Sequence, residues 1–486
     1  MNFGRVKDMQ IKNFAKTQHL VEFNLTKRAG EHSRLNFTAS ITDDEEASCL
    51  ACAGKKISVA TSDSTPIFLG RVESVEVERT IGAAQVKASC VSLSALTDEK
   101  KKSRLFHNPD KKISDVLSKS RLALEECNLT VAENLAAKKY PQVILQNQET
   151  NFNFIKRLAD KFNVRLWVED TSEPCAIKLD DCLAKGARTI EQERILSIRR
   201  VKEGKRERNF FTSRTCFQFG GVVKFESKSG GAGEFVIVGL KVWLEHESFI
   251  FRYELEELAQ EPTTQDESPT LAKSVKLRAK VTNTKDLKNL GRIQVKFEEP
   301  GVEDMDEKNP LWIPYRSPYF GQAGGIVFLP DKGDAVEIFF INEELYAVTA
   351  FRESALPQEC MKVEEKYIGN NFKQRIFWRE KSLEFFSDKH KIIMNDKGIE
   401  LTVGDNSIFL TEQGILLKTK DSKVSLSKDA AAQIGGKAEV KAASAELNAT
   451  GKVKVGGKEL SLDAQGNLDV KANSTLKLAG GKINLC

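Results

Sequence analysis

The chain has 486 residues and a mass of 54.3 kDa, which is too long for one core and predicts about three domains. Hydrophobic residues make up 40% and charged residues 29%, a composition typical of folded globular domains and not of disordered chains. The net charge of +5 comes from 74 basic and 69 acidic residues without a long cationic block, so a nucleic-acid partner gains no support.

Residues 1–258 are predicted to form a hub domain with two β-barrel-like parts. Runs such as HLVEFNLTKR and PIFLGRVESVEVER carry β-branched and apolar residues in partial alternation, which is typical of strands. Residues 111–127 and 151–162 instead space their apolar residues as helices do. The second of these helices would place four apolar side chains on one face: Phe154, Ile155, Leu158 and Phe162.

A linker and a small barrel are predicted next. Residues 259–270 are rich in Pro, Thr, Ser and acidic residues, a composition typical of a linker. Residues 271–356 contain short strands with turn residues between them, and five short strands in so few residues predict a barrel of the OB type. Alternation predicts six inward-facing positions: Ile293, Val295, Phe297, Val336, Ile338 and Phe340.

The C-terminal part carries an apolar repeat. Residues 357–397 are predicted to be connector strands, and in residues 398–486 apolar pairs recur with a period of eight, with Leu416 assigned to an intermediate repeat. Because residues i and i+2 share a face of a strand, each repeat would supply one short strand with a narrow apolar stripe. The predicted needle core consists of Ile408, Leu410, Val424, Leu426, Leu460, Leu462, Leu468, Val470, Leu476 and Leu478.

Such a narrow stripe cannot close a core by itself, so copies have to stack. A single-chain parallel β-helix uses roughly 20 or more residues per coil, whereas eight residues cover about one face. We therefore predict a homotrimer in which the chains intertwine and form hydrogen-bond ladders with one another. The predicted fold class is mainly β: a hub of β-barrel domains with helical inserts, an OB-fold barrel, and a C-terminal intertwined trimeric β-helix needle.

Several motifs resemble one known family. The segments NLGRIQVKF and WIPYRSPYFGQAGGIVFLPDKGDAVEIFFIN, followed by the octad tail, resemble the baseplate-spike family that includes VgrG proteins and phage tail spikes. QETNFNFIKRLADKFNVRLWVED is similar to the helix-strand signature in the hub half of that family, and FLGRVESVEVE resembles its first hub barrel. The resemblance covers nearly the whole chain and implies a structural spike at the tip of a contractile injection system. Such a spike joins the inner tube to a membrane-puncturing needle in a type VI secretion apparatus, an extracellular injection particle or a phage-like tail.

The resemblance also implies partners. These are inner-tube and baseplate proteins, a PAAR-like tip protein, effectors and, on firing, the membrane of a target cell. The apolar end of the chain is a candidate contact for the tip protein: Ile483, Leu485 and Cys486. Because the chain stops at AGGKINLC, we expect no effector domain fused at the C-terminus.

The number of cysteines and the N-terminal sequence indicate the compartment in which the protein is made. Nine scattered cysteines argue against a disulfide framework and for folding in a reducing compartment. The sequence shows neither the apolar region of a signal peptide nor a run of about 18 apolar residues that could span a membrane. We expect synthesis and assembly in the cytoplasm, and delivery outside the cell or into a target cell by the contractile machine.

The sequence offers little catalytic chemistry. No histidine has a second histidine at ligand spacing, His107 included, and the Cys49 and Cys52 pair lacks the second half of a zinc site. The acidic residues of one barrel loop are interpreted as solvated surface and not as a general acid and base: Glu298, Glu299, Asp304, Asp306 and Glu307. We therefore predict no enzyme, and no catalytic, cofactor-binding or metal-binding residue. Two alternatives stay open: a trimeric adhesin or carbohydrate-binding fibre, and an envelope-degrading enzyme.

Overall fold

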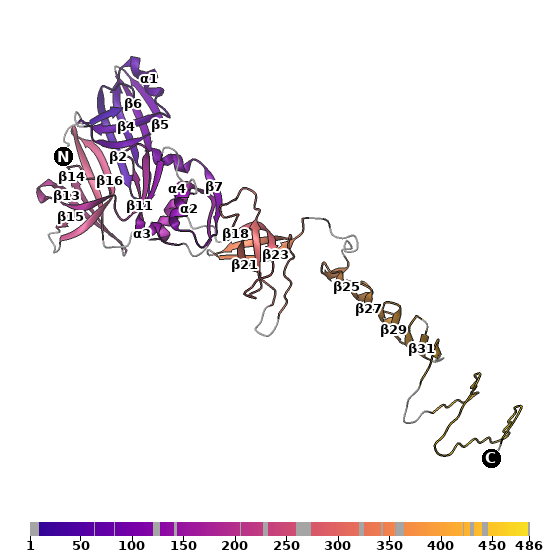
Figure 1. The fold of residues 1–486 in the computed structure, drawn as a ribbon. Helices are drawn as coiled ribbons and strands as arrows, with labels where there is room; N and C mark the ends of the chain where they lie inside the picture. The colour runs from indigo at the N-terminus through magenta and orange to yellow at the C-terminus, as the bar shows by residue number, and fades with distance from the viewer. Residues whose placement is uncertain are drawn as a thin grey trace. The chain divides into compact units, whose positions relative to one another are not determined.

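The computed structural model is mainly β and divides into two compact units, Met1–Ser354 and Ala355–Cys486 (Figure 1). The structure describes residues 9–62, 64–81, 83–119, 127–139, 143–204, 206–226, 232–258, 274–319, 325–341, 344–353, 355, 364–420, 422–427, 432–439 and 446–484. The predicted linker, residues 259–270, lies outside them. No helix in this described part is long and apolar enough to cross a bilayer.

The largest sheet of the first unit has twelve strands and combines segments that are far apart in the sequence. Its main path is β1-β4-β5-β6-β3-β2-β16-β17-β14-β13, and β15 connects β12 to β16. β2 and β16 are antiparallel with Leu25 opposite Val242, so the two barrel-like parts of the hub share one sheet. The strands are β1 (Met9–Lys12), β2 (His19–Arg28), β3 (Arg34–Ile41), β4 (Lys56–Thr61), β5 (Pro66–Thr80), β6 (Ala83–Ser92), β12 (Ala184–Thr189), β13 (Ile195–Glu203), β14 (Arg206–Ser213), β15 (Gly221–Glu226), β16 (Ala232–Glu245) and β17 (Ser248–Glu257).

Alternation along these strands builds the core. Phe23 and Leu25 of β2 point inward and are fully buried, as period-two patterning requires. Gly70 of β5 is needed at a close approach, because a Cβ there would lie 2.3 Å from the carbonyl oxygen of Val91. The short helix α1 (Glu46–Leu50) precedes β4. Three 3-10 turns complete this part and its borders: Asp43–Glu45, Leu93–Asp98 and Gln192–Arg194.

Residues between β6 and β12 form a smaller part with helices and its own apolar core. α4 begins where the Thr150 hydroxyl accepts a hydrogen bond from the Asn153 backbone N–H at 3.3 Å, an N-cap, and it buries Phe154, Ile155 and Leu158. Of the helix predicted over 111–127, the structure describes α2 at Ile113–Lys119, and residues 120–126 lie outside the described residues. Cys127 does not belong to the helix, because it pairs with Cys175 in a parallel ladder. The elements are β7 (Lys101–Phe106), α2 (Ile113–Lys119), β8 (Cys127–Val131), α3 (Glu133–Ala136), β9 (Ile144–Thr150), α4 (Asn151–Lys161), β10 (Arg165–Glu169) and β11 (Cys175–Asp180).

A five-stranded barrel completes the first unit, with the strand order β21-β19-β18-β22-β23. It closes where the backbone N–H of Arg316 donates to the Ala347 carbonyl at 2.9 Å, next to a bridge between Tyr315 and Ala347. The six predicted inward-facing residues are all buried, which confirms the alternation: Ile293, Val295, Phe297, Val336, Ile338 and Phe340. The five strands are β18 (Val275–Asn283), β19 (Arg292–Phe297), β21 (Leu311–Pro314), β22 (Ala335–Ile341) and β23 (Glu344–Phe351). The two-residue strand β20 (Glu303–Asp304) lies between β19 and β21 in the sequence and pairs with β7.

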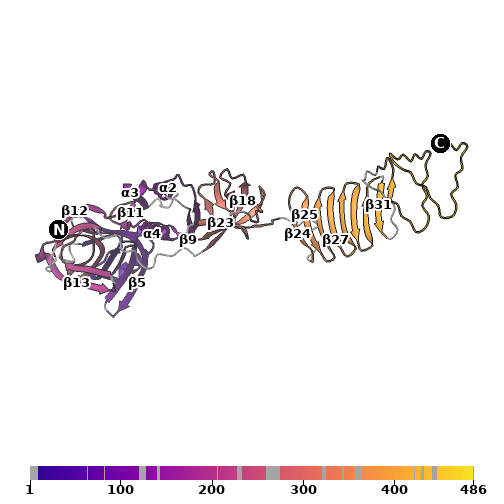
Figure 2. The same ribbon diagram turned by 90° about the horizontal axis from the view of Figure 1, so that it is seen from below.

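The second unit contains a nine-stranded antiparallel sheet in which each strand pairs with its sequence neighbours (Figure 2). Its first four strands lie in the segment predicted as connector. Both edges of β28–β31 are occupied by strands of the same chain, so the ladders between chains expected from residue 398 onward cannot form in this stretch. The strands are β24 (Lys366–Gly369), β25 (Gln374–Arg379), β26 (Ser382–Ser387), β27 (His390–Asn395), β28 (Gly398–Val403), β29 (Asn406–Thr411), β30 (Gly414–Lys418), β31 (Ser422–Ser427) and β32 (Ala432–Ile434).

Candidate functional site

The nine-stranded sheet has one continuous apolar face. In β29, Ile408 lies opposite Leu401 of β28 and Leu417 of β30. Its neighbour on the same face, Leu410, lies opposite Ile399 and Ile415. Because directly paired residues and residues two apart share a face, the stripe is two side chains wide on each strand. The register extends this stripe through Ile376, Trp378, Leu383, Phe385, Ile392, Met394, Val424 and Leu426.

The hairpins explain why the sequence repeat has a period of about eight. Strands of five or six residues are joined by two-residue turns, and the chain reverses direction at each turn. One set of same-face residues therefore recurs every sixteen residues: Ile376, Ile392, Ile408 and Val424. The alternate strands contribute pairs such as Ile415 and Leu417. The assignment of Leu416 to the repeat is wrong, because Leu416 pairs with Phe409 and Ser425 on the opposite face.

The opposite face of the sheet mixes charged and aromatic side chains. Lys391 Nζ lies 2.7 Å from Glu400 Oε1, and the hydrogen bond from Lys391 lowers the pKa of Glu400. Arg379 Nε lies 2.9 Å from Glu384 Oε2. The side chains of both ion pairs are half-buried, and their charged groups keep this face compatible with water.

Within the described part of the chain, the apolar face is left partly uncovered. The side chains of Leu401, Ile408 and Leu410 are exposed by 40%, 44% and 46%, and Ile415 and Leu417 by 38% and 39%. Single exposed apolar residues are ordinary, but a contiguous ordered row of them marks a surface that binds another protein surface. Val424 and Leu426 belong to this face by register, and their side chains lie outside the described part of the structure.

The remaining predicted core residues lie in a segment that contains no strand among residues 446–484. All six of these residues are exposed by 53% to 63%: Leu460, Leu462, Leu468, Val470, Leu476 and Leu478. The single chain therefore does not bring them together. Of the residues predicted to contact a tip protein, Ile483 is 50% exposed, and Leu485 and Cys486 lie outside the described residues.

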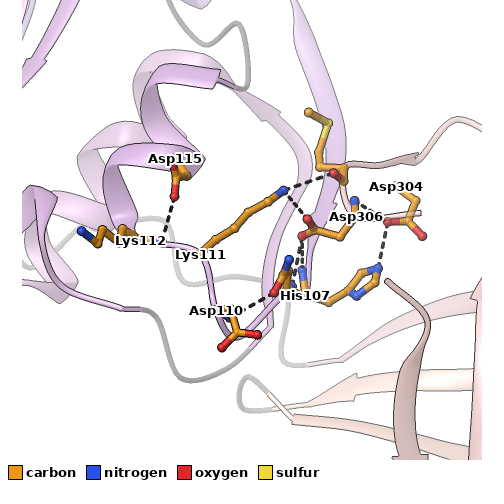
Figure 3. Close-up of polar contacts among 9 residues, drawn as sticks. His107, Asp110, Lys111, Lys112, Asp115, Asp304 and Asp306 are labelled. Carbon is orange, nitrogen blue, oxygen red and sulfur yellow. Dashed lines mark hydrogen bonds and ion pairs between the residues drawn. The ribbon is translucent and has the colours of Figure 1, made fainter. Parts of the chain in front are cut away.

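A buried polar cluster connects the helical part of the first unit to the barrel (Figure 3). His107 Nε2 lies 2.8 Å from Asp304 Oδ1. The Asp306 carboxylate accepts hydrogen bonds from the backbone N–H groups of His107 at 2.9 Å and Asn108 at 3.1 Å. The ammonium group of Lys111 forms an ion pair with the same carboxylate. We call these five residues the junction cluster.

Burial gives the junction cluster a structural role. The side chain of Asp306 is fully buried, and that of His107 is 2% exposed. Burial raises the pKa of Asp306. The hydrogen bonds from Lys111 and from the backbone N–H groups of His107 and Asn108 lower that pKa, and together they outweigh burial, so the pKa is below the ordinary value. The interpretation as solvated surface is thus wrong for Asp304 and Asp306, because β20 folds back onto β7. No local sequence pattern predicts the pairing of β20 with β7.

Other candidate chemistry is weak. Within the described residues no group of three His, Cys, Asp or Glu side chains is placed to hold a metal ion. Cys49 and Cys52 are both buried, and burial, followed by the neighbouring Cys52, raises the pKa of Cys49 to about 11. A thiol with so high a pKa carries almost no thiolate at neutral pH, so it is a poor nucleophile and a poor metal ligand.

Comparisons with known proteins agree with this geometry. Residues 277–350 match the family described as the type VI secretion system/phage-baseplate injector OB domain. An E. coli component of the type VI secretion system, described as structurally similar to bacteriophage tail proteins, superposes with a TM-score of 0.53. It has 11% sequence identity and covers 71% of this chain and 99% of its own. A VgrG complex with PdpA from Francisella, in a half-lidded form, has a TM-score of 0.50 and 9% identity, and covers 88% of this chain and 87% of its own. The sequence matches no curated protein.

These matches confirm two predictions. The barrel matches the injector OB-domain family, and the chain has a mainly β fold that resembles a VgrG structure over 88% of its length. The intertwined trimeric β-helix needle stays a prediction. The E. coli protein is described as a component of the type VI secretion system and the Francisella structure as a PdpA-VgrG complex, and these descriptions are consistent with the prediction that the chain is not an enzyme. At identities near 10% the structural likeness defines the fold, and the role of the chain rests on its own surfaces.

Proposed function

We propose that this chain is the structural spike at the tip of a contractile injection system, where it joins the inner tube to a membrane-puncturing needle. One observation carries the proposal. A sheet with an uncovered apolar face two residues wide follows an injector-type OB barrel in the same chain. That order of parts suits a protein whose C-terminal half is completed by identical copies of itself.

Three copies complete the sheet. Each copy turns its apolar face, with Ile408 and Leu410, towards a common axis and its mixed face, with Lys391 and Glu400, towards water. Most soluble homo-oligomers are closed and cyclic, so each residue recurs at the same level around the axis. In this arrangement the apolar stripe of each copy, two side chains wide, forms one side of a three-sided core. The competing arrangement is a dimer in which two such sheets pack face to face.

The segment 446–484 forms the intertwined end of the needle in this proposal. Its backbone groups have no ladder within the described chain, and such groups pair with another strand or with water. Strands from two further copies would satisfy them and would bury pairs such as Leu468 and Val470. The end of the chain, Ile483, Leu485 and Cys486, would then seat a small PAAR-like tip protein.

The remaining partners follow from the same role. The hub contacts inner-tube and baseplate proteins, the spike carries effectors, and the needle meets the target membrane on firing. The Francisella relative is described in a complex with PdpA, which supports spike partners in general. Assembly takes place in the cytoplasm, and the contractile machine delivers the spike outside the cell or into a target cell.

The test is the solution mass of the full-length chain by light scattering. The proposal expects three times 54.3 kDa. The mass of a monomer contradicts the proposal and favours a repeat that folds within a single chain. Twice the chain mass favours a dimer with two sheets packed face to face. Binding of the trimer to a glycan array would favour the adhesin alternative, and peptidoglycan turnover would favour the enzyme alternative.

A further inference from the structure

The helical part of the first unit contains two cysteines that face each other across a pair of strands. Cys127 begins β8 and Cys175 begins β11, and the two residues are direct partners in the parallel ladder between these strands. Both are free thiols. Neighbouring strands lie about 4.7–4.9 Å apart, and a disulfide needs a Cα separation of about 4.4–6.8 Å. The register therefore holds the two cysteines at a separation that a disulfide can bridge.

Both thiols belong to the apolar core of the helical part. Their side chains are completely buried. Ladder partners share a face of the sheet, and the next two pairs on this face are Ile177 with Leu129 and Leu179 with Val131. A single buried cysteine behaves as a small hydrophobic residue and needs no partner. Two thiols at matching positions of an otherwise aliphatic row have, in addition, the geometry for oxidation.

The two thiols are not equivalent. In the described part of the chain, β8 is an edge strand of its three-stranded sheet, whereas β11 lies between β10 and β8. An edge strand opens at a lower free energy than a central one, so a small oxidant reaches Cys127 first. The hydrogen bond from Cys175 lowers the pKa of Cys127, whereas the same hydrogen bond, followed by burial, raises the pKa of Cys175. Because the thiolate is the reactive form, Cys127 is the attacking thiol.

We propose that Cys127 and Cys175 form a redox-active dithiol, which is reduced during assembly and closes to a disulfide when the chain meets an oxidising environment. The oxidant is another disulfide, R–S–S–R. The Cys127 thiolate attacks one of its sulfurs, so that a mixed disulfide forms and RS⁻ leaves. Cys175 then loses its proton, and its thiolate attacks the Cys127 sulfur and releases the second RS⁻. Two cysteine thiols are oxidised, one disulfide is reduced, and the two protons released neutralise the two RS⁻ groups.

This inference goes beyond the proposed function. A chain made in the cytoplasm and delivered outside the cell passes from a reducing to an oxidising environment, and a disulfide is stable only in the second. The new bond would tie the edge strand β8 to β11 and restrict the unfolded chain between them, which stabilises the helical part. The dithiol itself depends on register and burial, and not on the number of copies in the assembly.

Oxidised glutathione tests the inference on the reduced full-length protein under native conditions. Its concentration is set so that the partly buried Cys182 takes up glutathione. Remaining thiols are alkylated in denaturant, and peptide mass spectrometry measures the product linked through Cys127 and Cys175. Cys90 is the matched control, because it is equally buried in a central strand but has a leucine and a valine as its ladder partners.

The expected result is a single intrachain disulfide, with oxidation of its two cysteines at least roughly tenfold faster than that of Cys90. Cys175→Ser should trap glutathione on Cys127, whereas Cys127→Ser should leave Cys175 largely unmodified. If the linked peptide does not form under these conditions, or forms only in denaturant, the inference is overturned, whatever the solution mass of the chain. A monomer that forms the linked peptide would sink the spike proposal and leave the dithiol standing.

Discussion

Replacement of Leu417 by Asp tests the apolar face directly. Leu417 lies on that face between Ile408 and Val424, and 39% of its side chain stays exposed in the single chain. Full burial of a leucine stabilises by about 1.5–3 kcal/mol, so covering the exposed remainder is worth about 0.6–1.2 kcal/mol per copy and about 2–4 kcal/mol per trimer. The variant loses this contribution in all three copies.

The introduced charges add a larger cost. In the proposed trimer, threefold symmetry would place three carboxylates at one level of a dry core, and each unpaired buried charge costs several kcal/mol even after relaxation. Together with the lost burial, the total is on the order of 10 kcal/mol, or about seven powers of ten in the trimer association constant. At micromolar concentration, light scattering should therefore find Leu417→Asp as a monomer.

Leu416→Asp is the matched control. Leu416 is the adjacent residue of the same strand, but it lies on the opposite face and is less exposed in the single chain. If the sheet of a single chain alone determined the effect, Leu416→Asp would destabilise the protein more than Leu417→Asp, because Leu416 is the less exposed residue. Association through the apolar face predicts the reverse order for the trimer mass. A trimeric Leu417→Asp variant with an unchanged mass would refute the assignment of this face to the axis.

Three further outcomes are expected. Asp306→Asn should lower the stability of the first unit by about 1–3 kcal/mol in thermal unfolding, whereas exposed Glu307→Gln should change it by less than about 1 kcal/mol. Because the folded pKa of Asp306 is depressed, its contribution is present above the unfolded value near 4 and is lost as pH falls through the folded pKa; Asp306→Asn should lack this acid dependence. Lys27→Met should cost about 3–5 kcal/mol in the same assay, because it leaves Asp170 buried and unpaired, and Lys27→Met/Asp170→Leu should recover much of that loss. Leu468→Asp should make the needle end sensitive to limited proteolysis, and an unchanged digestion pattern would count against an intertwined core there.

Local patterns in the sequence were sufficient for the barrel and for α4. Alternation of apolar residues placed Ile293 and Val295 inward, and both are buried because strand geometry repeats every two residues. The helical spacing around Phe154 and Leu158 worked for the same reason, since one stretch of chain carries the whole signal. The prediction of short strands in the C-terminal repeat is confirmed for residues 398–434 and not for residues 446–484, which contain no strand. Leu416 was assigned to the wrong face because a period of eight does not specify where each hairpin turns.

Contacts between distant segments could not be predicted from the sequence. The pairing of β2 with β16 joins residues more than two hundred positions apart, and neither strand encodes its partner. The burial of the junction cluster could not be predicted, for the same reason. Asp304 and Asp306 lie in a charged stretch typical of a surface loop, and only the return of β20 to β7 buries them. Long-range pairing decides burial here, whereas composition describes only the local segment.

The buried charges of the first unit share one feature: they lie where its parts meet. Lys27 of β2 pairs with Asp170, which follows β10, and both side chains are at most 4% exposed. Arg165 of β10 binds Glu256 of β17 at 2.9 Å, and Lys111 pairs with Asp306 next to the barrel. Apolar packing alone permits sliding, whereas a buried ion pair is lost if its partners shift, so it selects one orientation more than it adds stability. In the proposed role, a spike pushed through an envelope, the protein would have to keep its parts from turning against one another. We therefore expect variants at these pairs to loosen the parts of the first unit before they unfold them, visible as faster hydrogen exchange in β7, β10 and β20 at temperatures where the core of the large sheet stays protected.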